Sequence, residues 1–227
     1  MYRIESLRKL IRQLKDHGKV LAKLPVDELK VAISKGNQKI GRVMNVSLPP
    51  IISCKNCSGC KHLCYDVKAC LQYDNVRKAR MKNWTLLNKD RDEFFRQIDR
   101  ALYRRLLHKY FRWHVAGDIV DEDYFARMVE LARKHKLFRF WTYTKNYDDV
   151  NAYVEKHGKD SIPKNFSVMF SEWRGMEMRN PYGFPEFRVV FKDEVPPAGF
   201  YCPGNCDVCK ELERGCIVGE TTYCHEH

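Results

Sequence analysis

Four cysteines lie within eleven residues in the first third of this 227-residue sequence, with the spacing C-x2-C-x2-C-x3-C. They are Cys54, Cys57, Cys60 and Cys64. Such short spacings allow a loop to wrap around one centre, so that several thiolates converge on it. The same run holds iron–sulfur clusters in bacterial ferredoxins, although Tyr65 follows here instead of proline. We therefore predict a [4Fe-4S] cluster on this segment.

A second cysteine group lies near the C-terminus and has the spacing C-x3-C-x2-C, followed by one further cysteine. Its members are Cys202, Cys206, Cys209 and Cys216. C-x3-C-x2-C is also the spacing that holds three irons in radical S-adenosylmethionine enzymes. Those enzymes carry it early in the chain, whereas here it comes late and Cys216 is available as a fourth ligand. We interpret it as a second four-ligand [4Fe-4S] site.

Zinc is the alternative metal for both groups, because four thiolates suit tetrahedral zinc and paired C-x2-C motifs are common in zinc ribbons. Four cysteines within eleven residues favour a multi-iron cluster over a ribbon. Cys70 and Cys224 stand apart from the two runs, and we interpret them as bystanders or as alternate ligands. A reducing cytosol would keep all ten cysteines from forming disulfides. Because the N-terminus lacks an apolar signal segment, a cytoplasmic location is expected.

Strand and helix patterns alternate between the two groups. Helical periodicity covers 4–17, 75–88, 91–110, 122–135 and 148–157, with a further short helix over 26–34. Strand patterns cover 41–48, 111–116, 137–143, 165–171 and 187–191. This alternation predicts an α/β fold with a parallel sheet of about four to five strands, an open or partial β/α barrel. We divide the chain into a helical segment (1–40), an α/β core (41–201) and a cysteine-rich tail (202–227).

Polar residues follow three of the predicted strands. They are Gly117 and Asp118, Thr144 and Lys145, and Ser171 and Glu172. Ligands of open α/β sheets bind at the carboxyl ends of the strands. We therefore predict Asp118 and Lys145 as catalytic residues, and Gly117, Asp118, Thr144 and Lys145 as cofactor-binding residues.

The alternative for these strand ends is structural: Asp118 or Asp121 would cap a helix, and Lys145 would lie on the surface. His114, inside a strand pattern, is expected to be a core histidine.

The net charge of +12 is unevenly distributed. Residues 1–112 carry 26 Lys and Arg against 10 Asp and Glu, whereas residues 113–227 carry 15 against 19. A basic half indicates contact with nucleic acid or another anionic partner. Solvated helix faces are the alternative. No stretch is apolar enough to predict a membrane span.

Taken together, these motifs resemble the gene product 88 domain family of bacteriophages, plasmids and gut bacteria. The resemblance runs from about residue 40 to the C-terminus. Its motifs are Ser47-Leu48-Pro49, Cys54 to Tyr65, Asn75-Val76-Arg77 with Asn83, Gly117-Asp118, Thr142 to Lys145 and Cys202 to Cys216. It implies a protein of a mobile genetic element but no particular activity.

A fold-level likeness to radical S-adenosylmethionine enzymes adds S-adenosylmethionine as a candidate ligand. The sequence thus favours an iron–sulfur protein with a redox or radical-type role. A zinc-binding, nucleic-acid-associated protein is the alternative.

Overall fold

Eight strands form one open sheet in the computed structural model, which describes residues 2–38, 40–57, 59–104 and 108–226. The spatial order is β1-β2-β3-β4-β5-β6-β8-β7, and every neighbouring pair except β1 with β2 is parallel. The strands are β1 (Ile33–Ser34), β2 (Met44–Val46), β3 (Tyr110–Trp113), β4 (Arg139–Thr144), β5 (Phe166–Glu172), β6 (Glu186–Val190), β7 (Phe200–Tyr201) and β8 (Thr222–His225). The predicted α/β class with an open, mostly parallel sheet is confirmed.

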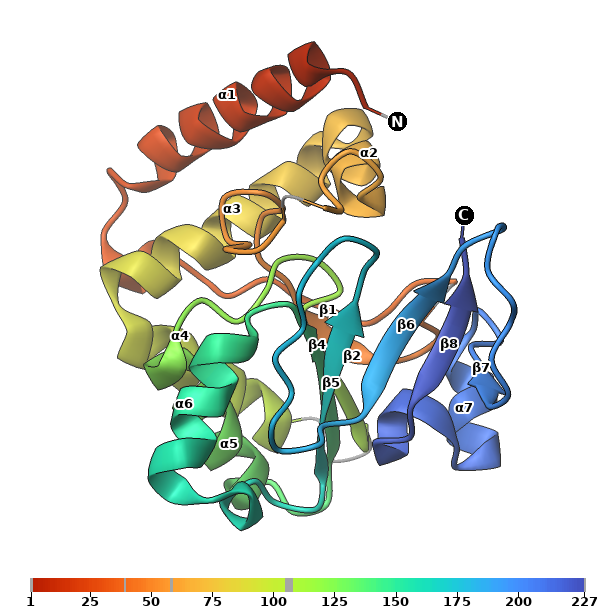
Figure 1. Cartoon of the computed structure of the whole chain (residues 1–227). Coiled ribbons are helices and arrows are strands. Elements are labelled where there is room, and N and C mark those ends of the chain that lie inside the picture. Colours follow the sequence, from red (N-terminus) through yellow and green to blue (C-terminus); the bar gives the residue numbers. More distant parts are fainter. Residues whose placement is uncertain (1, 39, 58, 105–107, 227) are drawn as a thin grey trace.

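Helices cover both faces and one end of this sheet (Figure 1). The α-helices are α1 (Ile4–Leu21), α2 (Tyr65–Gln72), α3 (Asp74–Lys89), α4 (Arg91–Tyr103), α5 (Glu122–Lys134), α6 (Tyr147–His157) and α7 (Cys206–Leu212). Short 3₁₀ helices are η1 (Val26–Glu28), η2 (Lys159–Ser161) and η3 (Gly215–Val218). Over the described ranges, no helix has the length and apolar character required to cross a membrane.

The two faces of the sheet are covered differently because side chains alternate along each strand. Phe111, Phe140 and Phe166 point to the face covered by α4, α5 and α6, where they join the largest apolar cluster. We call this the helical face. Trp141 and Met169 point to the opposite face, where they pack with cysteines and Ile217 of α7 and η3. We call this the cysteine face.

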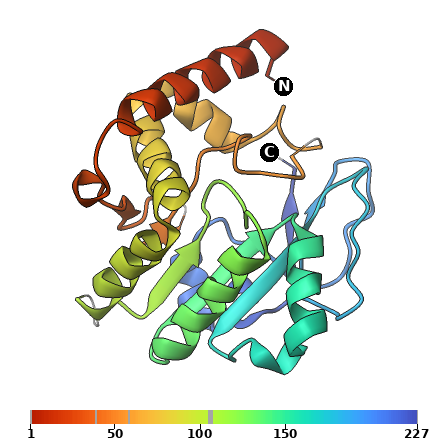
Figure 2. The same cartoon turned by 90° about the vertical axis from the view of Figure 1, so that its left-hand side faces the viewer.

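Helices α1, α2 and α3 form a separate layer at the end of the sheet where the parallel strands terminate (Figure 2). The apolar side of α1, formed by Leu7, Leu10 and Leu14, packs against Val67 of α2 and Met81 of α3. The opposite side of α1 faces solvent. The layer therefore lies over the strand ends where a ligand site is predicted.

Most predicted elements are confirmed to within a few residues at their ends, and several are wrong. The expected helix over 26–34 is instead η1 followed by β1, because Pro25 begins only a single 3₁₀ turn. The strand predicted for 111–116 ends at Trp113, since His114 adopts a φ of +54°. The helix predicted for 91–110 ends at Tyr103, and residues 105–107 of that range lie outside the described residues.

The sheet is also larger than predicted, with eight strands in place of four to five. The strands that sequence periodicity missed are β1, β7 and β8, which have two to four residues each. A two-residue alternation cannot be distinguished from loop sequence. Helix α2 was missed as well, because it begins directly after Cys64.

Asn83 of α3 provides a stability test, because its buried amide joins the helical layer to the sheet edge. Its Oδ1 accepts from the Ala32 N–H at 2.7 Å, and its Nδ2 donates to the carbonyls of Ala32 and Ser47 at 3.1 and 2.9 Å. Asn83→Ala should lower the free energy of unfolding by about 2 to 3 kcal/mol, since buried backbone groups lose their partners.

Urea denaturation measures this loss. Asn88→Ala is the matched control, because Asn88 is exposed on the same helix and, among the described residues, its side chain bonds only to the Trp84 carbonyl. Its change should stay within about 0.5 kcal/mol. Equal losses in the two variants would contradict the assigned role of Asn83.

Candidate functional site

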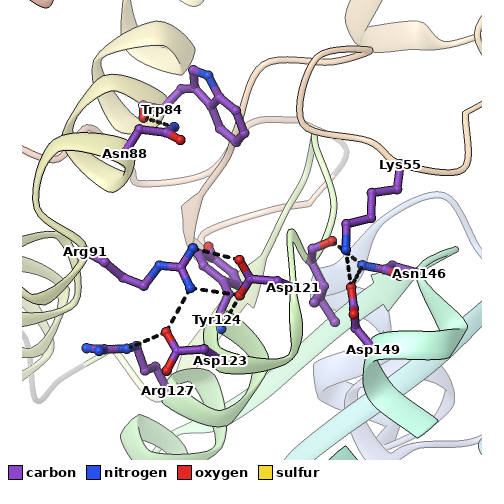
Figure 3. A network of polar contacts seen from close by, with 11 residues as sticks. Lys55, Trp84, Asn88, Arg91, Asp121, Asp123, Tyr124, Arg127, Asn146 and Asp149 are labelled. Carbon is purple, nitrogen blue, oxygen red and sulfur yellow. Dashed lines mark hydrogen bonds and ion pairs between the residues drawn. The ribbon is translucent and has the colours of Figure 1, made fainter. Parts of the chain in front are cut away.

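The first cysteine group lies in the loop that follows β2, at the carboxyl end of the sheet and beside α2 and α3 (Figure 1). Two polar contacts tie this loop to the rim of the sheet. Lys55 Nζ is 2.6 Å from Asp149 Oδ2 near the start of α6, as Figure 3 shows. Asn56 Nδ2 donates to the carbonyl of Lys145 at 2.7 Å. The loop is thereby held against the C-terminal end of β4 and the N-terminal end of α6.

The four thiols of this group lie within electrostatic reach of one another. Burial raises the pKa of the Cys54 thiol, with further contributions from Asp118, Cys57 and Cys64. Burial also raises the pKa of Cys57, and the nearby Cys60 adds to it. The pKa of Cys64 is raised by burial and, more weakly, by Cys60. Without a metal Cys54, Cys57 and Cys64 are protonated thiols, and a bound cation would stabilise their thiolate forms.

Asp118 and Lys145 meet at the rim beside Cys54. The Asp118 carboxylate accepts hydrogen bonds from Thr144 Oγ1 at 2.6 Å and from the backbone N–H groups of Lys145 and Ile119 at 2.9 and 2.7 Å. Burial raises the pKa of Asp118, and these hydrogen bonds together with the Lys145 ammonium act against that rise. Lys145 Nζ donates to Ser171 Oγ at 2.8 Å. Asp118, Thr144, Lys145 and Ser171, from three strand ends, thus lie in one network, whereas Glu172 pairs with Arg188.

Helix capping falls to Asp121, not to Asp118. Asp121 is the N-cap of α5, where its side chain accepts from the Tyr124 N–H at 2.8 Å. Arg91 of α4 holds the same carboxylate and that of Asp123, and Figure 3 shows the three side chains together. Asp118 is therefore not needed to begin the helix.

His114 and Cys70 lie in the interior, as expected for packing residues. His114 Nε2 is 3.0 Å from the Tyr124 hydroxyl, and the two rings stack. Burial, reinforced by the nearby Arg112, lowers the pKa of His114 to about 3, so its ring is neutral. Cys70 is fully buried, with its sulfur 3.5 Å from Asp66 Oδ2.

Gly117 adopts a φ of +85°, and the space that a side chain would occupy is filled by neighbouring residues. An added Cβ would lie 2.6 Å from Leu48 Cβ and 2.8 Å from Ser53 Oγ. Both neighbours precede Cys54 in the chain. The missing side chain at residue 117 therefore allows the cysteine loop to approach the end of β3 closely.

The second cysteine group lies on the cysteine face, within α7, η3 and the segments beside β8. Cys209 and Cys216 are each 7% exposed and pack with Trp141 and Met169. Burial raises the pKa of Cys209 to about 12, and Cys206, Cys202 and Cys216 add to this rise. Two of the four predicted cysteines, Cys206 and Cys209, lie on α7, a helix that the sequence did not predict, while Cys216 lies in η3 and Cys202 follows β7.

A fifth cysteine, Cys224 of β8, lies close to this group. Burial raises its pKa to about 11, with contributions from Cys202 and Cys216, while the Lys145 ammonium lowers it. The backbone N–H of Cys202 donates to the Tyr223 carbonyl at 2.7 Å, which sets the two segments side by side. Pairing of β8 with β6 and β7 brings Cys224 here, and linear spacing carried no such signal.

Arg112 of β3 is a charged residue that the sequence reasoning did not single out. Its guanidinium carbon lies 4.5 Å from the centre of the Tyr143 ring on the cysteine face. Burial raises the pKa of Cys206, and Arg112 opposes that rise through its charge and a hydrogen bond. Tyr143 also lies within hydrogen-bonding reach of Cys216. An arginine between Phe111 and Trp113 in an apolar strand was the available signal.

The donor chemistry of both groups fits a thiophilic metal. Sulfur ligands suit iron–sulfur clusters and zinc alike. Throughout the described residues, no three His, Cys, Asp or Glu side chains are already arranged as a site for a metal ion. The cysteines are grouped at 54–70 and 202–224, and all ten are free thiols.

The family model described as gene product 88 matches residues 8–201, which is well over half of the chain. The chain belongs to the gene product 88 family. Searches among curated proteins and among solved structures give no match.

The extent of the gene product 88 match differs from the expected one at both ends. It begins at residue 8, so most of α1 belongs to the matched region, although the first 40 residues were expected to lie outside it. It ends at residue 201, directly before Cys202. The match therefore includes the first cysteine group and the Asp118–Lys145 network but not the second group.

Gly117 yields a prediction about how closely the cysteine loop packs. Gly117→Ala should lower the free energy of unfolding through backbone strain of about 1 kcal/mol and steric overlap of about 1 to 3 kcal/mol. Gly158→Ala is the control: its φ is +76°, but nothing lies within 4 Å of an added Cβ. Thermal or urea unfolding should show the larger loss at Gly117. A loss no greater than that of Gly158→Ala would contradict the close packing.

Proposed function

We propose that this gene product 88 family member is an iron–sulfur protein with two [4Fe-4S] clusters and a redox or radical-type role at the mouth of the sheet. One observation carries the proposal. Cys54 interacts electrostatically with Asp118, and Cys224, which lies close to the second group, interacts electrostatically with Lys145. These interactions support a site that involves both cysteine groups and the polar network.

Each cluster would take four thiolates as ligands. The first set is Cys54, Cys57, Cys60 and Cys64, and the second is Cys202, Cys206, Cys209 and Cys216. Binding would draw the thiols of each group closer together and remove their protons. Such clusters supply electrons one at a time, at a potential set by charge and hydrogen bonds around the sulfurs.

Asp118 and Lys145 have different roles in this proposal. Asp118 is 6% exposed and accepts three hydrogen bonds, so it holds the ends of β3 and β4 together. The Lys145 ammonium carries three donors, of which Ser171 takes one. Lys145 is therefore the group that would bind an anionic substrate or the carboxylate of S-adenosylmethionine. Thr144 and Gly117 lie beside Lys145 and Asp118 at the same strand ends.

Free thiols in both groups suit a reducing cytoplasm, because disulfides would consume the ligands. The family assignment favours a role in a mobile genetic element. Zinc remains the alternative metal, since four thiolates hold it equally well.

Metal counting after anaerobic purification and reconstitution tests the proposal. We expect about eight iron and eight sulfide per chain, with the visible absorbance of iron–sulfur clusters. Replacing Cys54, Cys57, Cys60 and Cys64 by serine should leave about half of the iron, and so should replacing the second set. Cys70→Ser is the control and should retain the full content. One or two zinc ions without visible absorbance would overturn the proposal in favour of the alternative.

A second candidate function is nucleic-acid binding through α1. Its solvent side carries five exposed cations, Arg8, Lys9, Arg12, Lys15 and Lys19. Of these, Lys19 alone forms an ion pair within the described residues, with Asp16. Unpaired cations along one helix face can contact successive phosphates. Iron–sulfur binding and nucleic-acid binding are compatible, since they use different parts of the chain.

The salt dependence of binding to duplex DNA and to single-stranded RNA tests this function. Replacing Arg8, Arg12 and Lys15 by glutamine should weaken binding and reduce the slope of log K against log salt by about 2 to 3. The control replaces Lys136, Arg139 and Lys164, which are also exposed but lie away from α1. Lack of binding at low salt, or equal effects of the two triple variants, would rule out α1 as the interface.

A further inference from the structure

Arg112 places a positive charge on the face of the sheet that carries the second cysteine group. Its neighbours on β3, Phe111 and Trp113, belong to the core of the helical face. Alternation along the strand turns the Arg112 side chain the other way, over the Tyr143 ring. The guanidinium therefore lies against the cysteine face, where Arg112 is half-buried.

This charge has no carboxylate partner. Twenty ion pairs are formed across the described part of the chain, and Arg112 takes part in none of them. Its Nε is buried and lacks a hydrogen-bond partner. Removing a charged group from water without a counter-charge is costly in free energy. An anionic group is thus expected beside the guanidinium.

Thiols and phenols lie near Arg112. Tyr143, whose ring lies beneath the guanidinium, packs in one cluster with Cys206, Cys209 and Cys216. Tyr143, Tyr65, Cys206 and Cys216 also interact electrostatically with the guanidinium. Cys206 begins α7, and Cys216 lies in η3 within reach of the Tyr143 hydroxyl. Four thiolates around either a [4Fe-4S]²⁺ cluster or Zn²⁺ carry a net charge of about −2. A metal centre on this group would supply the missing negative charge.

We propose that Arg112 is the counter-charge of the second metal centre and keeps its hydrogen bond to the sulfur of Cys206 when that centre is formed. The inference rests on the proposed metal binding by Cys202, Cys206, Cys209 and Cys216, and it holds for iron or zinc. Arg112 is not a ligand; it is a positioning residue that stabilises the bound, anionic state. Hydrogen bonds to metal-bound groups from outside the ligand set change metal affinity by about 10- to 100-fold.

The experiment compares wild-type full-length protein with Arg112→Gln, Arg112→Lys and a control, Arg188→Gln. Arg188 lies on β6, with its side chain partly exposed and paired with Glu172. Competition with a chelator measures metal affinity, and an EPR-monitored redox titration measures the midpoint potential of each cluster. Arg112→Gln should lower the affinity of the second cysteine group for its metal by about 10- to 100-fold.

Arg112→Gln should also shift one of the two midpoint potentials to a more negative value, because the reduced and more negative state loses a nearby cation. Arg112→Lys retains the charge and should restore the potential in part. It also provides the comparison if the glutamine variant does not fold.

The two hypotheses can fail separately. If wild-type protein binds no metal, both the proposed function and this inference are wrong. If wild-type protein binds metal at the second group but the Arg112 variants match Arg188→Gln in affinity and potential, only the inference is overturned. In that case the Arg112 guanidinium binds an anion other than the metal centre.

Discussion

A buried carboxylate at the end of β3 is the constraint on which the arrangement of the site depends. Asp118 is almost inaccessible to water, so its charge must be satisfied by donors from the protein. Those donors are Thr144 Oγ1 and the backbone N–H groups of Lys145 and Ile119. Because Asp118 bonds to the end of the neighbouring strand β4, it sets the position from which the Lys145 side chain projects. The cysteine loop, bonded to the Lys145 carbonyl through Asn56, is then held against the same strand end.

The sheet separates two kinds of packing, and this separation determines where chemistry can occur. The helical face is filled by aromatic side chains and by α4, α5 and α6, and its buried polar groups include His114 and Tyr124, which contact each other. The cysteine face carries Arg112, Tyr143 and five thiols. Thiols packed beside apolar residues stay protonated until a metal binds, so they are unreactive as nucleophiles without one. Metal binding and the electrostatics of this face are therefore coupled.

The family match and the structure divide the protein in different ways. The gene product 88 match covers α1 to the end of β7 and thus contains the first cysteine group and the Asp118 network. The second cysteine group follows that range, yet β8 pairs with both β6 and β7 and lies inside the sheet. The C-terminal residues are consequently part of one structural unit with the core. Among their cysteines, Cys224 interacts electrostatically with Lys145 of that network.

The α/β class, most helices, the longer strands, the two cysteine groups and the polar residues at three strand ends can all be predicted from the sequence. These features are local: periodicity, spacing and residue type are all visible within a short window. Tertiary structure alone decided that Asp118 binds a neighbouring strand while Asp121 caps α5, and that Cys224 joins Cys202 and Cys216. It also placed Arg112 beside Cys206. These contacts depend on the pairing of strands that are far apart in the chain. Two of these strands, β7 and β8, are too short to give a periodic signal. Their pairing is set by the packing of the whole sheet.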